Sequence, residues 1–132
     1  MIHYFYVNET NVKLSGRADR IDMIDNTIRV LDYKSGSVKD DDMIVNKDAS
    51  TLDKLSAKSL QLIIYKYLYV KEHPNINLKN ITIEPGIIGL RKLSNGIFTL
   101  NNNSKAFDDD NFIESCDTLF KDIFSEILRK LL

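Results

Sequence analysis

The sequence predicts one α/β (α+β) domain in which helices pack on a mixed β-sheet. Along the chain the patterns are three strands, a helix, two strands and a final helix, without a repeat or a long linker. The 132 residues, 43% of them hydrophobic, match the length of one domain and suffice for a core. We therefore expect residues 1–132 to form a single domain.

The first three strands are expected before the middle of the chain. Residues 2–7 and 27–34 are rich in β-branched and aromatic residues. Residues 11–24 alternate well enough for a strand between them, with Gly16 marking a bulge or a close approach. The Asp-Asn pair at 25–26 tolerates the positive φ of a tight turn, which predicts a hairpin there.

A helix is predicted after a loop of turn-forming and charged residues at 35–50. Ser50 or Thr51 is expected to cap this helix, and Pro74 to stop it at about His73. Its middle, LQLIIYKYLYV, is apolar on almost every side. Such a helix is expected to pack on more than one face.

Two strands and a helix complete the prediction. The strands are expected over 81–93 and 96–100, joined by a turn at 94–96. The helix is expected from about Asp110 to Leu131, with acids at its start and bases at its end, as the helix macrodipole favours. Its predicted buried stripe consists of Phe112, Cys116, Leu119, Ile123 and Ile127.

The composition restricts the classes of function. A net charge of −1 argues against a nucleic-acid binder that relies on a wholly basic surface. No apolar run approaches the ~18 residues of a membrane-spanning helix, and the start lacks the pattern of a signal peptide, so we expect a cytoplasmic protein without a membrane partner. The single cysteine, Cys116, is expected to be a packed thiol, and it excludes a multi-cysteine iron–sulfur cluster.

The segment VLDYKSG, residues 30–36, places two charges at the end of an apolar strand. Because strand side chains alternate, Asp32 and Lys34 share one face. A two-residue hairpin loop at 25–26 would place Asp19 opposite Asp32 on this face, and Asp22 opposite Arg29 on the other.

Two opposed carboxylates repel each other unless a cation lies between them. Mg²⁺ or Mn²⁺ suits such oxygen ligands, and Lys34 would then orient or deprotonate a water and neutralise charge on a phosphate. In the alternative interpretation, Asp32 and Lys34 are solvated charges at the end of an edge strand, and Asp19 pairs with Arg17 or Arg20.

Three motifs carry a resemblance to a known family. They are GRADRID at 16–22, DYKSG at 32–36, and Gln61 with Tyr65 on the predicted helix. In this order they resemble the RecB-like branch of the PD-(D/E)XK nuclease superfamily, which includes AddB-like nuclease domains. The resemblance implies a restriction-endonuclease-like core that hydrolyses DNA phosphodiesters with Mg²⁺ or Mn²⁺ in DNA repair or recombination, with a fused or associated helicase as a possible partner.

The resemblance also implies roles for individual residues. Catalytic roles fall to Asp19, Asp32, Lys34, Gln61 and Tyr65. The metal would be bound by Asp19, Asp32 and the backbone carbonyl of Tyr33. Arg20 and Asp22 are expected to be structural or to support the metal ligands, because the hairpin sends both to the opposite face.

The chain also departs from the family pattern. Family members usually have a helix before the first strand, with a His or Glu that completes the metal site, and no such helix fits before Asp19. His3 lies in a strand-like run and is not assigned that role. We expect the chain to be the C-terminal portion of such a domain. The alternative function is an inactive nuclease-like domain that binds single-stranded DNA or a protein partner.

Overall fold

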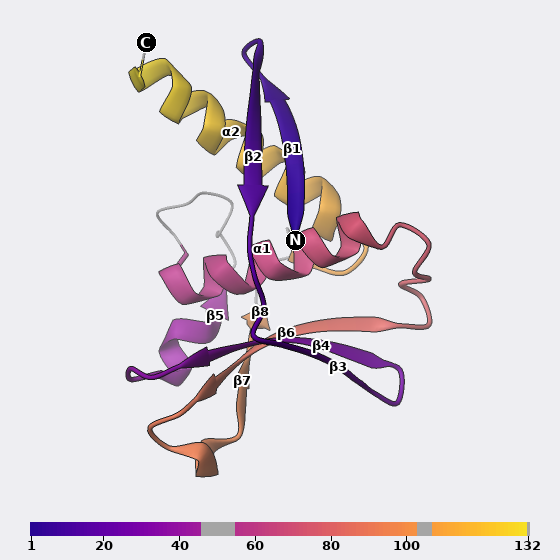
Figure 1. Ribbon diagram of the computed structural model, residues 1–132, viewed down its shortest axis with the longest axis vertical. Coiled ribbons are helices and arrows are strands. Elements are labelled where there is room, and N and C mark those ends of the chain that lie inside the picture. Colours follow the sequence, from indigo (N-terminus) through magenta and orange to yellow (C-terminus); the bar gives the residue numbers. More distant parts are fainter. Residues whose placement is uncertain (46–54, 103–106, 132) are drawn as a thin grey trace.

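A four-stranded mixed sheet forms one layer of the molecule (Figure 1). A computed structural model describes the protein over residues 1–45, 55–102 and 107–131. The strands follow the order β3 (Arg20–Ile24), β4 (Thr27–Lys34), β6 (Thr82–Gly89) and β7 (Ile97–Thr99). Within this described sheet only the β4–β6 pair is parallel, so these two strands end at the same edge of the sheet. The predicted fold class, an α+β domain with a mixed sheet flanked by helices, is confirmed.

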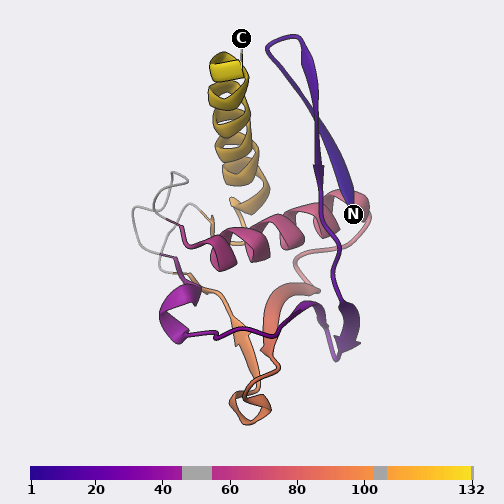
Figure 2. The same cartoon turned by 60° about the vertical axis from the view of Figure 1, so that its left-hand side comes forward.

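The strand predicted over 11–24 is two strands. Its first part, β2 (Thr10–Ser15), pairs with β1 (Ile2–Val7) in a separate hairpin, and its second part is β3. Between them the chain passes α1 (Ala57–Glu72), where a Cβ on Gly16 would lie 3.1 Å from Cε1 of Tyr65. The prediction of one strand was wrong because alternation alone does not show that the two halves pair on different sides of a helix (Figure 2).

Helix α1 begins later than predicted. Its N-cap is Ser56, whose hydroxyl accepts a hydrogen bond from the Ser59 N–H at 3.0 Å. The predicted caps, Ser50 and Thr51, lie outside the described residues. The predicted end is confirmed, because the helix stops at Glu72 with His73 as its C-cap.

Helix α1 separates the sheet from a second layer, formed by the β1–β2 hairpin and α2 (Phe112–Leu131) (Figure 2). Toward the hairpin and α2 it buries Ile63 and Tyr67, and toward the sheet it buries Leu62 and Tyr65. The prediction that this helix packs on more than one face is confirmed. Burial on two sides explains why its sequence is apolar nearly all round.

Helix α2 packs against α1 and the β1–β2 hairpin through its first turns. Phe112, Cys116 and Leu119 are buried as predicted, so Cys116 is a packed thiol, and Ile123 is partly buried. Ile127 is 48% exposed, so its prediction was wrong. The last turns of α2 extend past α1 (Figure 1), whereas Phe120, nearer its start, packs its ring 5.1 Å from that of Tyr67.

The segment predicted as a loop at 35–50 contains a short 3₁₀ helix, Asp40–Met43, and β5 (Ile44–Val45), which pairs with β8 (Asn101–Asn102). Its residues after Val45 lie outside the described part of the chain. The strand predicted to reach residue 93 ends at Gly89, because a 3₁₀ turn, Leu93–Asn95, leads into β7. No helix in the described residues is long and apolar enough to span a membrane.

Candidate active site

The end of β4 places Asp32 and Lys34 on the sheet face that α1 covers. Val30, which shares this face, packs against the Tyr65 ring. The Nζ atom of Lys34 lies 2.9 Å from Oδ2 of Asp32. Asp32 is only 7% exposed, so a carboxylate is buried beside an ammonium group at the end of a central strand.

Asp19 lies just before β3 and turns its side chain toward β4. The predicted hairpin register is confirmed for the paired residues, from Ile24 opposite Thr27 to Arg20 opposite Leu31. Asp19 is one residue beyond the last pair, and its N–H donates to the Leu31 carbonyl at 2.9 Å. Its Oδ2 accepts a hydrogen bond from the Tyr33 N–H at 2.8 Å, which brings this carboxylate to the residue next to Asp32.

The backbone carbonyl of Tyr33 belongs to the same group of oxygens. In a β-strand the N–H and C=O of one residue point to the same edge of the strand. Because the Tyr33 N–H points to the side chain of Asp19, its carbonyl faces that edge as well. The Asp19 carboxylate and the Tyr33 carbonyl therefore lie on one edge of β4, beside Asp32.

Helix α1 supplies Gln61 and Tyr65, one turn apart. Nε2 of Gln61 donates to the Tyr65 hydroxyl at 2.9 Å, and that hydroxyl lies 3.4 Å from Oδ1 of Asp32. Burial, and then the negative charge of Asp32, raise the pKa of Tyr65, with a smaller contribution from the charge of Asp19. The phenol is therefore a neutral donor at physiological pH, close to both carboxylates.

The segment before Asp19 fixes the position of Tyr65, a role that sequence reasoning missed for Arg17. The Tyr65 hydroxyl lies 3.0 Å from the Arg17 carbonyl, nearer than Asp32, so its single proton is best placed to go there. Gly16 lets the chain approach the ring, since an added Cβ would come within 3.1 Å of it. In the sequence only Gly16 indicated a close approach. The Arg17 carbonyl could not be predicted, because every residue type carries a backbone carbonyl.

The oxygen groups fit a hard divalent cation. Oδ2 of Asp32 is buried, and within the described residues it meets Lys34 as an ion pair but has no partner with hydrogen-bond geometry. No cluster of three His, Cys, Asp or Glu side chains that could hold a metal lies in the described part of the chain. Mg²⁺ nevertheless commonly binds through one or two carboxylates and completes its shell with water and substrate phosphate oxygens.

Asp22 and His3, two other titratable residues of the first strands, lie away from this site. Asp22 forms ion pairs with Arg29 at 2.7 Å and Arg20 at 2.9 Å on the opposite face of the hairpin. The His3 ring packs 4.9 Å from that of Phe5 and 5.6 Å from that of Tyr67 in the second layer. His3 therefore belongs to the aromatic packing of the second layer.

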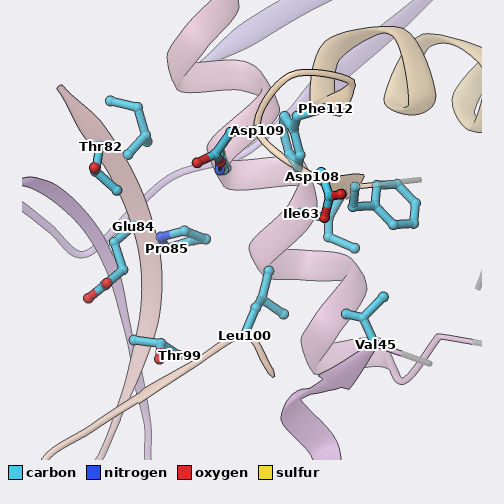
Figure 3. Close-up of a pocket in the computed structure, with 13 residues that line it drawn as sticks. Val45, Ile63, Thr82, Glu84, Pro85, Thr99, Leu100, Asp108, Asp109 and Phe112 are labelled. Atoms are coloured by element: carbon cyan, nitrogen blue, oxygen red, sulfur yellow. Dashed lines mark hydrogen bonds and ion pairs between the residues drawn. The ribbon is translucent and has the colours of Figure 1, made fainter. Parts of the chain in front are cut away.

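A separate cavity of about 290 Å³ lies beside the first half of β6 (Figure 3). Its lining includes Lys66, which pairs with Asp109 at 2.9 Å and lies 4.6 Å from the centre of the Phe112 ring. None of the predicted site residues lines it. The chemistry suggested by the sequence therefore lies at the other end of the sheet, where β4 ends.

Comparison with known families identifies this arrangement. The family model described as the PD-(D/E)XK nuclease superfamily matches residues 2–129. The chain belongs to the PD-(D/E)XK nuclease superfamily. No curated protein and no solved structure matches the chain.

Membership of the PD-(D/E)XK superfamily indicates nuclease activity and implies DNA as the substrate. Nucleases of this superfamily generally use divalent metals. The oxygen groups at the end of β4 are compatible with this chemistry, because the buried Oδ2 of Asp32 meets Lys34 as an ion pair without hydrogen-bond geometry within the described residues.

Proposed function

We propose that this PD-(D/E)XK protein is a RecB-like DNA nuclease that hydrolyses phosphodiesters with Mg²⁺ or Mn²⁺ in repair or recombination. The observation that carries the proposal is the buried Asp32 carboxylate, paired with Lys34 and close to Asp19. A buried carboxylate is costly unless it is both paired and hydrogen-bonded, and Oδ2 of Asp32 has the Lys34 ammonium at 2.9 Å without hydrogen-bond geometry.

Side chains from β4 and α1 would have different roles in hydrolysis. Lys34 would orient the attacking water and offset the negative charge that develops on the phosphate. Gln61 and Tyr65 would position that water or the phosphate, and their mutual hydrogen bond of 2.9 Å keeps both on one side of the site. Packing of the Tyr65 ring against Val30 and Gly16 excludes water from the rear of the site.

Asp19, Asp32 and the Tyr33 carbonyl are the residues that would hold the metal. A bound Mg²⁺ or Mn²⁺ would supply Lewis-acid polarisation of the phosphate and lower the pKa of the attacking water. Asp32 keeps its place because β4 is flanked by β3 and β6, and Asp19 because it accepts the Tyr33 N–H. The protein contributes a rigid set of ligands to this chemistry.

The test compares the protein with its Asp19→Ala and Lys34→Ala variants. We expect Mg²⁺-dependent cleavage of labelled single-stranded DNA by the unmodified protein, lost in both variants without a change in circular dichroism. Cleavage at the original rate by either purified variant would refute these roles. A purified helicase of the RecB type, added to the assay, tests the proposed partnership through stimulation of cleavage.

A second candidate function is binding of single-stranded DNA or a protein partner without cleavage. It is favoured by the lack of a third acidic, His or Cys ligand near Asp19 and Asp32 among the described residues. A titration with Mn²⁺ separates the two candidate functions. Metal binding is monitored by electron paramagnetic resonance, because the signal of unbound Mn²⁺ decreases as the ion binds. Binding that disappears in Asp32→Asn supports the nuclease, whereas DNA binding without any metal binding supports the second candidate.

A further inference from the structure

A second cavity, of about 170 Å³, adjoins the site on the next strand. Lys34 is the register partner of Gly89 in the parallel β4–β6 pair, and the Leu90 N–H donates to the Lys34 carbonyl at 2.8 Å. A Cβ on Gly89 would lie 3.7 Å from Val38, which also lines the cavity. Register partners point to the same sheet face, so the cavity opens on the face that carries Lys34, about one strand spacing of 4.8 Å away.

The lining of this cavity is cationic and polar. Its side chains include the exposed Arg91 and Lys92, with Ser37 and Asn95 as neutral donors, and no acid lines it. Neither Arg91 nor Lys92 has an ion pair across residues 1–45, 55–102 and 107–131. Two cations without an acid beside them are available to an anionic ligand.

A neighbouring cavity adds no net charge to the region. A larger cavity of about 710 Å³ shares Val38, Asn95 and Phe98 with the 170 Å³ cavity. It adds one base and one acid, Lys39 and Asp40. The net positive charge of the region therefore comes from Arg91 and Lys92.

Gly36 is a glycine that the fold does not require. Its φ is not positive, and an added Cβ would have no atom within 4 Å. Gly36 therefore contrasts with Gly16, where an added Cβ would crowd the Tyr65 ring. Because Gly36 lines the cavity, its missing side chain leaves open the space that a ligand would occupy.

We propose that this cavity binds a phosphate of the DNA strand adjacent to the phosphate that is cut, an inference that rests on the proposed nuclease function. The cavity borders Lys34 on two sides, because its lining includes Gly89, the register partner of Lys34, and Gly36, two residues further along the chain. Its volume is several times the about 30 Å³ of one water in the liquid, which leaves room for a phosphate group. Arg91 and Lys92 would hold the phosphate, and the Ser37 hydroxyl would add a neutral hydrogen bond.

The test measures the affinity of the full chain for a fluorescein-labelled thymidine oligonucleotide by anisotropy in EDTA, so that it does not depend on cleavage. The double variant Arg91→Gln/Lys92→Gln is expected to bind about 10-fold more weakly or worse, because charge-assisted hydrogen bonds are lost. The slope of log affinity against log salt should fall by about 0.7, because one phosphate of the single strand is no longer neutralised. The matched control is Arg129→Gln/Lys130→Gln, an exposed pair at the far end of α2 (Figure 1).

A second variant, Gly36→Val, fills the cavity without altering charge. It is expected to weaken binding at least threefold while the melting temperature stays constant, because neither the backbone nor the packing at residue 36 needs a glycine. Equal binding by the protein and the Arg91/Lys92 variant, an equal loss in the α2 control, or no binding by the unmodified protein would overturn the inference. Cleavage lost only in Lys34→Ala would still support the nuclease proposal after such a result.

Discussion

Two acid–base pairs on the β3–β4 hairpin have opposite surroundings. On one face, Arg29 donates from Nε and Nη2 to the two oxygens of Asp22, both at 2.7 Å, and Arg20 adds a contact at 2.9 Å. On the other face, Asp32 meets Lys34 at 2.9 Å, but its Oδ2 has no hydrogen-bond partner among the described residues. The first pair satisfies its carboxylate with hydrogen bonds, whereas the second holds Oδ2 of Asp32 by an ion pair alone within the described residues.

The difference separates a structural pair from a candidate catalytic pair. The Asp22 carboxylate is bound in a planar, bidentate arrangement, which satisfies its oxygens and leaves little for a metal. Lys34 has a point charge on a flexible stem and neutralises Asp32 without saturating it. Arg29 of the first pair precedes Asp32 of the second by three residues along β4, so substitutions in one pair serve as controls for the other.

The largest expected effect is on cleavage by the Asp32→Asn variant. Loss of the metal-facing charge is expected to reduce cleavage at least about 100-fold, the size seen when one preorganised electrostatic group is removed. Asp22→Asn, an identical chemical change on the other face, is expected to retain cleavage. Rates measured with labelled DNA in Mg²⁺ check both, and equal losses in the two variants would contradict the separation of roles.

The next effect is stabilisation by metal. At a Mn²⁺ concentration about 100 times the Kd, binding to the folded state alone adds about 2.7 kcal/mol to the free energy of unfolding. The melting temperature of the protein is expected to rise with Mn²⁺, and that of Asp32→Asn to stay constant. Differential scanning fluorimetry with and without EDTA measures the change, and a rise in both proteins would place the metal elsewhere.

A smaller effect is expected for Tyr65→Phe. The variant loses the hydroxyl that lies 3.0 Å from the Arg17 carbonyl and 3.4 Å from Asp32, while the ring stays packed. Because one hydrogen bond contributes about 1 kcal/mol, cleavage should fall about 3- to 10-fold. Tyr69→Phe, a control in the same helix and the same core cluster, is expected to leave the cleavage rate constant.

The smallest effect is the stability lost in Asp22→Asn, and it depends on pH. The hydrogen bond from Arg29 holds the pKa of Asp22 below its ordinary value of 3.8. The stabilisation is therefore present above pH 3.8 and is lost as the pH falls through the lowered pKa of the folded state. The melting temperature of Asp22→Asn should be slightly lower than that of the protein at neutral pH and equal at strongly acidic pH; a difference that persists in acid would contradict this cause.

The sequence was informative where spacing determines geometry. A two-residue turn at 25–26 sets the register of the hairpin, which is why the Asp22–Arg29 pair was predictable. Gln61 and Tyr65 are four residues apart on a helix, so their shared face was predictable as well. Both cases depend on contacts that are local in the chain.

Other parts of the site depend on contacts that no local pattern encodes. The break between β2 and β3 arises because the chain crosses α1, and the Arg17 carbonyl that receives the Tyr65 hydroxyl has no side-chain signature. The cavity lined by Arg91 and Lys92 lies near the end of β4 because β4 pairs in parallel with β6, a strand far along the sequence. The parallel register of β4 and β6 fixes these positions, and this register cannot be read from the sequence alone.

The placement of α1 between two layers has a further consequence. Two tyrosines of this helix, two residues apart, have different roles. Tyr65 faces the candidate active site, and Tyr67 packs in the aromatic core with the hairpin and α2. A tilt of the helix that improved one environment would disturb the other. A substitution in this aromatic cluster, for instance at Phe120, is therefore expected to slow hydrolysis although the residue does not contact the candidate active site.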